Sequence, residues 1–108
     1  MKKSAPVSEA KLETLGEGRY RVSGVLDAVT VPGLLRESVQ RMFTASGAEL
    51  QIDLGGVKES DSAGLALVLE WLRQARHRSQ KIRFANVPRQ IAALARISEV
   101  DALVLGDV

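Results

Sequence analysis

A strand, helix and strand in succession in the second half of the chain constrain its fold more than any other sequence feature. Residues 49–54 form an apolar strand candidate, an apolar helix candidate runs from Asp61 to about Arg78, and residues 81–85 form the next strand candidate. Strands that alternate with helices pair in parallel within one sheet. The sequence therefore predicts an α/β fold.

The first half of the chain adds a hairpin and a helix to this pattern. Residues 11–15 and 19–25 are predicted strands on either side of the turn residues 16–18. A helix is predicted to begin at Thr30, whose side chain can cap it, and to end at Ser46-Gly47. The hairpin would open the sheet with an antiparallel pair.

Three shorter segments complete the predicted order of elements. Residues 55–60 are expected to form a loop, residues 86–97 a helix, and residues 102–105 a last short strand. The result is a single-layer mixed sheet, mostly parallel after the opening hairpin, with helices packed on it.

Length and composition favour one small domain and exclude several kinds of chemistry. With 108 residues, the chain is expected to fold as one domain over residues 9–108, after a flexible N-terminus at residues 1–8. No apolar segment follows Lys2 and Lys3, so no secretory signal is expected, and no apolar run is long enough to span a bilayer. The chain has no cysteine and only one histidine, His77, so we expect no metal site and no cofactor.

The charge pattern argues against a nucleic-acid-binding protein. The formal net charge is only +2, and the basic residues between Arg73 and Arg83 cluster at the end of one predicted helix. No aromatic residues are interleaved with them to stack on bases. We therefore expect no nucleic-acid partner.

Catalytic motifs are also missing from the sequence. Ser62 lacks the flanking glycines of a nucleophile elbow, and His77 would lie ~22 Å away on the same helix, too far to act as its base. Several carboxylates remain available for an enzyme whose active site lies in the loops, although helix capping and solubility are their commoner roles. These carboxylates are Asp27, Asp53, Glu59, Asp61 and Glu70.

Ser62 is the first residue to weigh for function, because it stands where a strand candidate leads into the long helix. Orphan backbone N–H groups and the positive end of the helix dipole converge there, so its hydroxyl can cap the helix. The alternative is a surface hydroxyl that a partner protein contacts or that a kinase phosphorylates.

The segment Asp61-Ser62-Ala63-Gly64-Leu65 resembles the signature of STAS domains, in which an Asp, a Ser or Thr, a small residue, a Gly and an apolar residue open a helix. The order of predicted elements from about Ala10 to Gly106 is also similar to that fold. The resemblance implies that Ser62 lies at a partner interface, with Asp61 beside it and Gly64 allowing close backbone approach. Many STAS domains have an additional C-terminal helix, whereas this sequence stops three residues after its last predicted strand.

Two branches of that family fit, and they differ in partner. The continuous apolar run from Gly64 to Leu69, with Trp71 behind it, is more similar to the B subunit of Mla phospholipid transporters. That resemblance implies a non-enzymatic cytoplasmic subunit, held at the inner membrane by an MlaF-like ATPase that works with a permease. The alternative is an anti-sigma-factor antagonist that is regulated by phosphorylation of Ser62.

The helix wheel also predicts a docking face on the long helix. Its core stripe is expected to comprise Leu65, Val68, Leu69, Leu72 and Ala75. Leu67 and Trp71 fall outside this stripe, and we expect them to form an exposed ridge beside Ser62. The predicted partner-binding residues are Asp61, Ser62, Ala63, Gly64, Leu67 and Trp71. A homodimer through the edge of the first strand is left open by the sequence.

Overall fold

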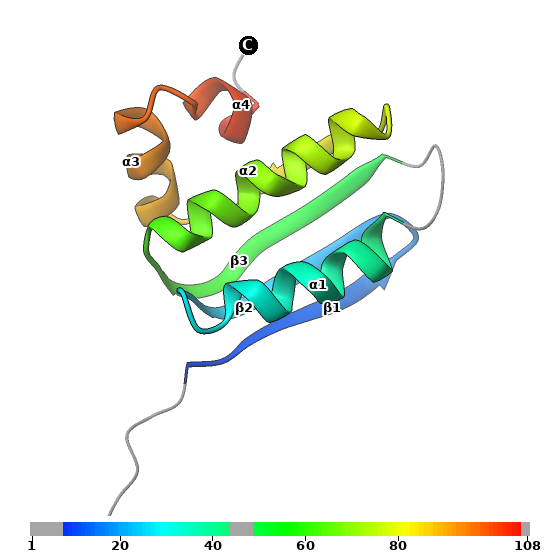
Figure 1. Cartoon of the computed structure of the whole chain (residues 1–108), viewed down its shortest axis with the longest axis horizontal. Helices are drawn as coiled ribbons and strands as arrows, with labels where there is room; N and C mark the ends of the chain where they lie inside the picture. The colour runs from blue at the N-terminus through cyan, green and yellow to red at the C-terminus, as the bar shows by residue number, and fades with distance from the viewer. Residues whose placement is uncertain (1–7, 44–48, 107–108) are drawn as a thin grey trace, which may run out of the picture.

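The computed structural model describes residues 8–43 and 49–106 (Figure 1). Strands and helices follow one another in the order β1, β2, α1, β3, α2, β4, α3 and α4. Their bounds are β1 Ala10–Gly16, β2 Arg19–Leu26, α1 Val31–Met42, β3 Leu50–Ser60, α2 Ser62–His77, β4 Ile82–Ala85, α3 Arg89–Ile97 and α4 Asp101–Leu105.

The four strands form one mixed sheet in the order β1-β2-β3-β4. The β1–β2 hairpin is antiparallel, and the β2–β3 and β3–β4 pairs are parallel. Helices α1 and α2 lie side by side over the sheet, and α3 and α4 lie beside α2 on the side away from α1 (Figure 1). The predicted α/β fold, with a mixed sheet that is parallel after the opening hairpin, is confirmed.

The core lies between this helical layer and one face of the sheet. Leu50, Ile52 and Leu54 alternate along β3 and are almost fully buried, whereas Gln51 between them is exposed. On the open face, Asp53 accepts hydrogen bonds from Asn86 at 2.9 Å and from the Arg21 guanidinium at 3.4 Å. The period-2 pattern of the strand therefore separates a buried apolar face from a polar, ion-paired one.

Strand β3 is longer than the sequence predicts, because the segment expected as a loop, residues 55–60, continues the parallel pairing with β2. The register shifts twice along this pair, between Arg21 and Ser23 and between Gly24 and Val25. A Cβ at Gly56 would stand 2.7 Å from the Cβ of Ser23. Glycine is needed here because the two backbones approach closely, so a residue type that usually marks a loop instead permits the pairing.

The last predicted strand, residues 102–105, is wrong: this segment is part of helix α4. The amides of Leu103 and Val104 both donate to the Val100 carbonyl at 3.1 Å, which starts the helical turn. Gly106 ends the helix in a left-handed conformation, with φ of 69°. A short apolar run does not by itself distinguish a strand from a helical turn. Here the helical turn is favoured because it buries Val104 on the inner side of α4.

The entry into α1 also differs from the predicted cap. The Thr30 hydroxyl does not cap the helix; it donates to the Val25 carbonyl at 2.7 Å and accepts from the Asp27 amide at 3.1 Å. The Asp27 carboxylate accepts from the amides of Val29 and Thr30 and so fixes the turn before the helix. The predicted helix end at Ser46-Gly47 lies outside the described residues, as does the predicted flexible N-terminus except for Ser8.

The edge strand β1 is partly covered by a side chain of α1. Arg41 donates to the Leu12 carbonyl at 2.8 Å and to the Thr14 hydroxyl at 2.7 Å, and it is also paired with Glu37. A backbone acceptor that is already hydrogen-bonded, with a side chain lying over it, is less available to another chain, so Arg41 disfavours dimerisation through this part of the edge.

Trp71 and Leu67 are core residues, so the prediction of an exposed ridge is wrong. The exposed fraction of the Trp71 side chain is 0% and that of Leu67 is 1%. The indole N–H of Trp71 donates to the Ser38 hydroxyl of α1 at 2.7 Å, and its ring stacks on Phe84 of β4 at 6.3 Å between centroids. Helix α2 contacts both the sheet and α1, so its buried arc includes the flank on which Leu67 and Trp71 lie.

The hydrogen bond between Trp71 and Ser38 should be a measurable part of the stability. Ser38→Ala leaves the buried indole N–H without a partner and should lower the free energy of unfolding by ~1–3 kcal/mol. Urea denaturation of Ser38→Ala, of Trp71→Phe and of the double variant would measure the coupling between the two residues. Additive losses would contradict a direct interaction, and Ala66→Ser on the exposed side of α2 is a suitable control.

Candidate functional site

The junction between β3 and α2 is built around Asp61, which is the residue that caps the helix. Its carboxylate accepts from the Ala63 amide at 2.8 Å, and its own amide donates to the Leu26 carbonyl of β2 at 3.2 Å. The Ser60 hydroxyl donates to the Asp61 carbonyl at 3.1 Å. The helix start is therefore fixed to the sheet without any contribution from the Ser62 hydroxyl.

Ser62 occupies the first position of α2 and is exposed. Within the described part of the chain, its hydroxyl makes no hydrogen bond, and Asp61 rather than Ser62 caps the helix. A hydroxyl at the N-terminal end of a 16-residue helix also lies in the positive field of the helix dipole. The side chain is thus free to accept or donate a hydrogen bond to another molecule, or to be modified.

Gly64 is required where the first turn of α2 crosses the end of β3. A Cβ added at Gly64 would overlap the Ser60 hydroxyl and would stand 3.2 Å from the Ser60 Cβ and 3.3 Å from the Leu26 Cβ. This close approach agrees with the role that the sequence predicts for Gly64. In the structure this role is one of packing, because Gly64 is buried against Ser60 and Leu26.

An acidic depression of about 350 Å³ adjoins Ser62. Three carboxylates, those of Asp27, Glu59 and Asp61, lie in or next to it. Hydrogen bonds from the Ser8 hydroxyl, and next from the Thr30 amide, hold the pKa of the Asp27 carboxyl below its ordinary value. These charges define a negative surface at neutral pH. The lining residues are Val25, Leu26, Asp27, Glu59, Ser60, Asp61 and Gln90.

The structure places the predicted partner-binding residues in two environments. Asp61 and Ser62 are exposed at the helix start and Ala63 is half-buried, whereas Gly64, Leu67 and Trp71 are buried. The loop between β2 and α1 supplies what the sequence analysis missed, since Val29 is 73% exposed on the turn that Asp27 fixes. An Asp three residues before a Thr at a helix start is a sequence signal for such a turn.

The other candidate catalytic groups do not converge on this site. Asp53 lies on the open face of the sheet, Glu70 is paired with Arg73 at 2.6 Å, and His77 is at the opposite end of α2 from Ser62. Within residues 8–43 and 49–106, no three His, Asp or Glu side chains are grouped to bind a metal ion. Of the five candidate carboxylates, all of which are described, only Asp27, Glu59 and Asp61 share one surface, the open depression beside Ser62.

Comparison with protein families decides what kind of domain this is. The family model described as "Mlab, STAS domain" matches residues 11–105, which include all four strands except the first residue of β1. The chain belongs to the STAS domain family. STAS domains are generally non-enzymatic regulatory or accessory domains that act through protein–protein interaction.

A solved structure supports the same fold. The anti-sigma factor antagonist SpoIIAA in its unphosphorylated form is similar to this STAS domain with a TM-score of 0.69 at 16% sequence identity, over 89% of this chain and 85% of that one. No curated protein matches the chain. None of the described helices is both long enough and apolar enough to cross a membrane.

Gly64→Ala should destabilise this STAS domain although alanine favours helix formation. The added methyl group pushes the Ser60 hydroxyl away from the Asp61 carbonyl and crowds Leu26, at an expected cost of ~1–3 kcal/mol. In a Ser60→Gly background the same Gly64→Ala substitution should lower the stability much less, because both Ser60 contacts are then removed. Thermal unfolding of the two pairs of variants measures the difference. Equal losses in the two backgrounds would contradict the proposed crowding.

Asp61 and Ser62 should differ sharply in their effect on stability. Asp61→Ala removes the helix cap and should cost ~1 kcal/mol, whereas Asp61→Asn keeps a good capping side chain and should cost much less. Ser62→Ala should change the free energy of unfolding by less than ~0.5 kcal/mol, because no hydrogen bond within the described chain is lost. A larger loss in Ser62→Ala than in Asp61→Ala, measured by denaturation, would show that the cap is misassigned.

Proposed function

We propose that this STAS domain is a non-enzymatic cytoplasmic subunit that binds and supports the ATPase of an Mla-type phospholipid ABC transporter. The observation that carries the proposal is the exposed Ser62 hydroxyl on a helix start that is already capped and packed without it. The family model described as "Mlab, STAS domain" supports this branch of the family. The chain would stay at the inner membrane through an MlaF-like ATPase and its permease.

The mechanism in this proposal is docking between preformed surfaces. The Asp61 cap and the Gly64 contact hold the start of α2 against β3, so little conformational entropy is lost when a partner binds. The partner surface would carry basic groups opposite Asp27, Glu59 and Asp61, an apolar contact for Val29, and a hydrogen-bonding group for Ser62. Binding would stabilise the ATPase in its assembled arrangement.

Ser62 would act in this docking as a point of control. A phosphoryl group there would add a charge of about −1.5 to −2 beside Asp61 and near Asp27 and Glu59. The helix dipole favours that charge, so the fold would tolerate it, while the partner would meet a larger and more negative surface. Phosphorylation, or a Ser62→Asp substitution, would therefore act on binding more than on folding.

The alternative function is an anti-sigma-factor antagonist that captures an anti-sigma kinase until Ser62 is phosphorylated. The similarity of the fold to SpoIIAA favours it, because that protein is an antagonist with an unphosphorylated form. Both functions use the same surface, so they differ in the partner and in whether a kinase modifies Ser62.

A pull-down with matched variants separates these functions. Wild type, Ser62→Ala and Ser62→Asp would be used as baits for cytoplasm and detergent-solubilised membranes, and the captured proteins identified by mass spectrometry. Ser98→Asp is the control, because it adds the same charge at an exposed serine of the α3 C-cap. We expect wild type, Ser62→Ala and Ser98→Asp to capture an ABC ATPase with its permease. The amount of ATPase captured by Ser62→Asp should be at least ~10-fold lower.

Other results of the pull-down would contradict the transporter function. A histidine-kinase-like anti-sigma factor captured by wild type and lost with Ser62→Asp would establish the alternative. Neither partner, or an ATPase that Ser62→Asp retains in full, would mean that the Ser62 surface is not the docking site.

A further inference from the structure

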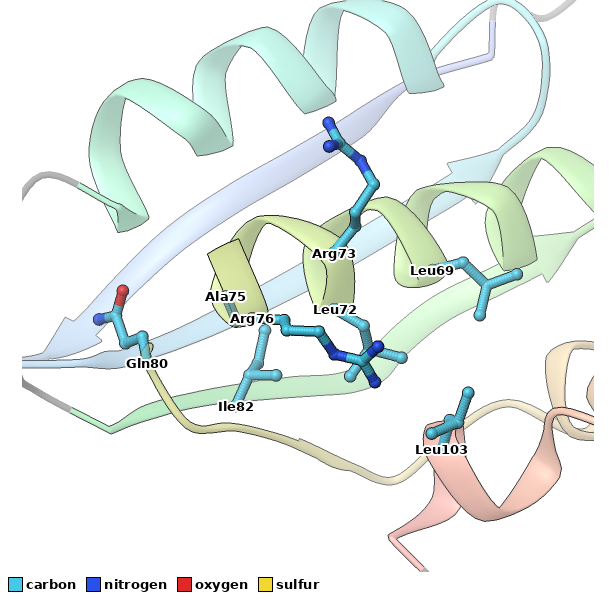
Figure 2. Close-up of a pocket in the computed structure, with 8 residues that line it drawn as sticks. All are labelled: Leu69, Leu72, Arg73, Ala75, Arg76, Gln80, Ile82 and Leu103. Carbon is cyan, nitrogen blue, oxygen red and sulfur yellow. The ribbon is translucent and has the colours of Figure 1, made fainter. Parts of the chain in front are cut away.

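A second surface, which begins about two helical turns beyond Ser62, is an apolar groove of about 430 Å³ along α2 (Figure 2). Leu69 and Leu72 of α2 and Leu103 of α4 lie along it, with Ile82 of β4 on its floor. Leu103 is 51% exposed, although it is a large apolar side chain. We name this surface the α2–α4 groove; it is lined by Leu69, Leu72, Arg73, Ala75, Arg76, Gln80, Ile82 and Leu103.

The α2–α4 groove exists because α2 is covered unequally on its two flanks. Its flank with Leu67 and Trp71 packs against α1, whereas the other flank is contacted by α3 and, beyond α3, is reached only by α4, which is five residues long. Helix α4 buries Val104 and leaves Leu103 facing outward. Leu69 and Leu72 are therefore half-buried, although the sequence predicts both in the core stripe.

The charges at the α2–α4 groove have one sign. Two arginines, Arg73 and Arg76, and no carboxylate line it. Arg73 is already paired with Glu70, with its guanidinium 2.6 Å from the carboxylate, whereas Arg76 has no ion pair among the described residues and is exposed. An apolar channel with an uncompensated guanidinium beside it is complementary to an apolar segment that carries acidic residues.

We infer that the α2–α4 groove binds an acidic amphipathic helix of a partner protein. Leu69, Leu72 and Arg76 follow one side of α2 over seven residues, or ~10 Å. Two turns of a partner helix with apolar residues at positions i, i+3 and i+7 span the same length. Its Asp or Glu residues would meet Arg76, and its apolar face would cover Leu72 and Leu103.

Two other occupants fit the α2–α4 groove less well. A bilayer surface is bound by apolar side chains that protrude from a basic helix face, whereas these leucines surround a hollow. A second copy of this chain offers no suitable helix in its described part, because α1, α2 and α3 each contain at least as many arginines as carboxylates and α4 is too short. The partner is therefore a different protein.

The groove would add a contact beyond the proposed docking at Ser62. Ser62 and Leu69 are seven residues apart on α2, and Ser62 and Arg76 are fourteen apart, which corresponds to ~10 and ~21 Å along the helix axis. The groove thus begins about two turns of α2 beyond Ser62, so one partner protein that docks at Ser62 can also extend a helix into the α2–α4 groove. Two linked contacts strengthen an assembly through effective concentration.

The test uses the full chain and two synthetic helical peptides that differ only in charge. Both peptides carry leucines at i, i+3 and i+7; one has glutamates and the other lysines at the flanking positions. Backbone amide NMR shifts should map the acidic peptide to Leu69, Leu72, Ile82 and Leu103, and the lysine peptide should bind at least ~5-fold more weakly. Arg76→Glu should lower the affinity for the acidic peptide roughly 5- to 10-fold and raise the affinity for the lysine peptide.

Controls distinguish this outcome from non-specific binding. Arg36→Glu reverses an exposed charge on α1 and should leave both affinities unchanged, and Leu103→Ala should weaken the acidic peptide without altering the thermal melt. Equal affinity for the two peptides, shifts outside the groove, or no binding at millimolar concentration would overturn the inference. Changes in the amide NMR shifts of the groove residues that phosphatidylglycerol vesicles cause, but the acidic peptide does not, would overturn it in favour of a lipid surface. Failure of the Ser62 pull-down would leave these results unaffected, because peptide binding to the α2–α4 groove depends neither on Ser62 nor on the protein that docks there.

Discussion

Burial of Trp71 is the constraint on which the arrangement of the helical layer depends. The indole contacts Ser38 of α1 through its N–H and Phe84 of β4 through its ring, so one side chain joins three elements. That contact sets the rotation of α2 about its own axis. With the Trp71 flank held against α1, the opposite flank with Leu69 and Leu72 is left half-exposed, and Ser62 points to solvent at the helix start.

The start of α2 combines a rigid backbone with an unengaged side chain. Three neighbouring residues divide the structural work, since Asp61 caps the helix, Ser60 bonds to the Asp61 carbonyl, and Gly64 lets the turn approach β3. Ser62 takes no part in it, so a change at Ser62 alters the surface without loosening the fold. A site that a partner contacts or a kinase modifies needs this arrangement, in which the residues that stabilise the fold are not the residue that is recognised.

Local patterns in the sequence were enough for the hairpin, the parallel strands and the strand-to-helix junction at Asp61. Packing between elements that are distant in the sequence determines the features that these patterns did not predict. A helix wheel shows which residues of α2 are apolar, but it does not show that α1 covers the Leu67 and Trp71 side while α4 leaves Leu72 partly open. Similarly, Gly56 marks a loop by composition and belongs to a strand only because β2 lies close beside it. The grouping of Asp27 with Asp61 likewise depends on the loop before α1, whose position the sequence does not define.

The Arg41 side chain on the edge strand has a consequence for behaviour at high concentration. By donating to the Leu12 carbonyl, it engages a backbone acceptor that an extended segment of another molecule would use for β-addition, and its bond to the Thr14 hydroxyl holds it over this edge. Intermolecular sheet growth, the first step of aggregation in many small α/β proteins, is thereby opposed on the β1 side. At high concentration, neighbouring molecules are therefore discouraged from extending the sheet at β1, which is one of its two edge strands.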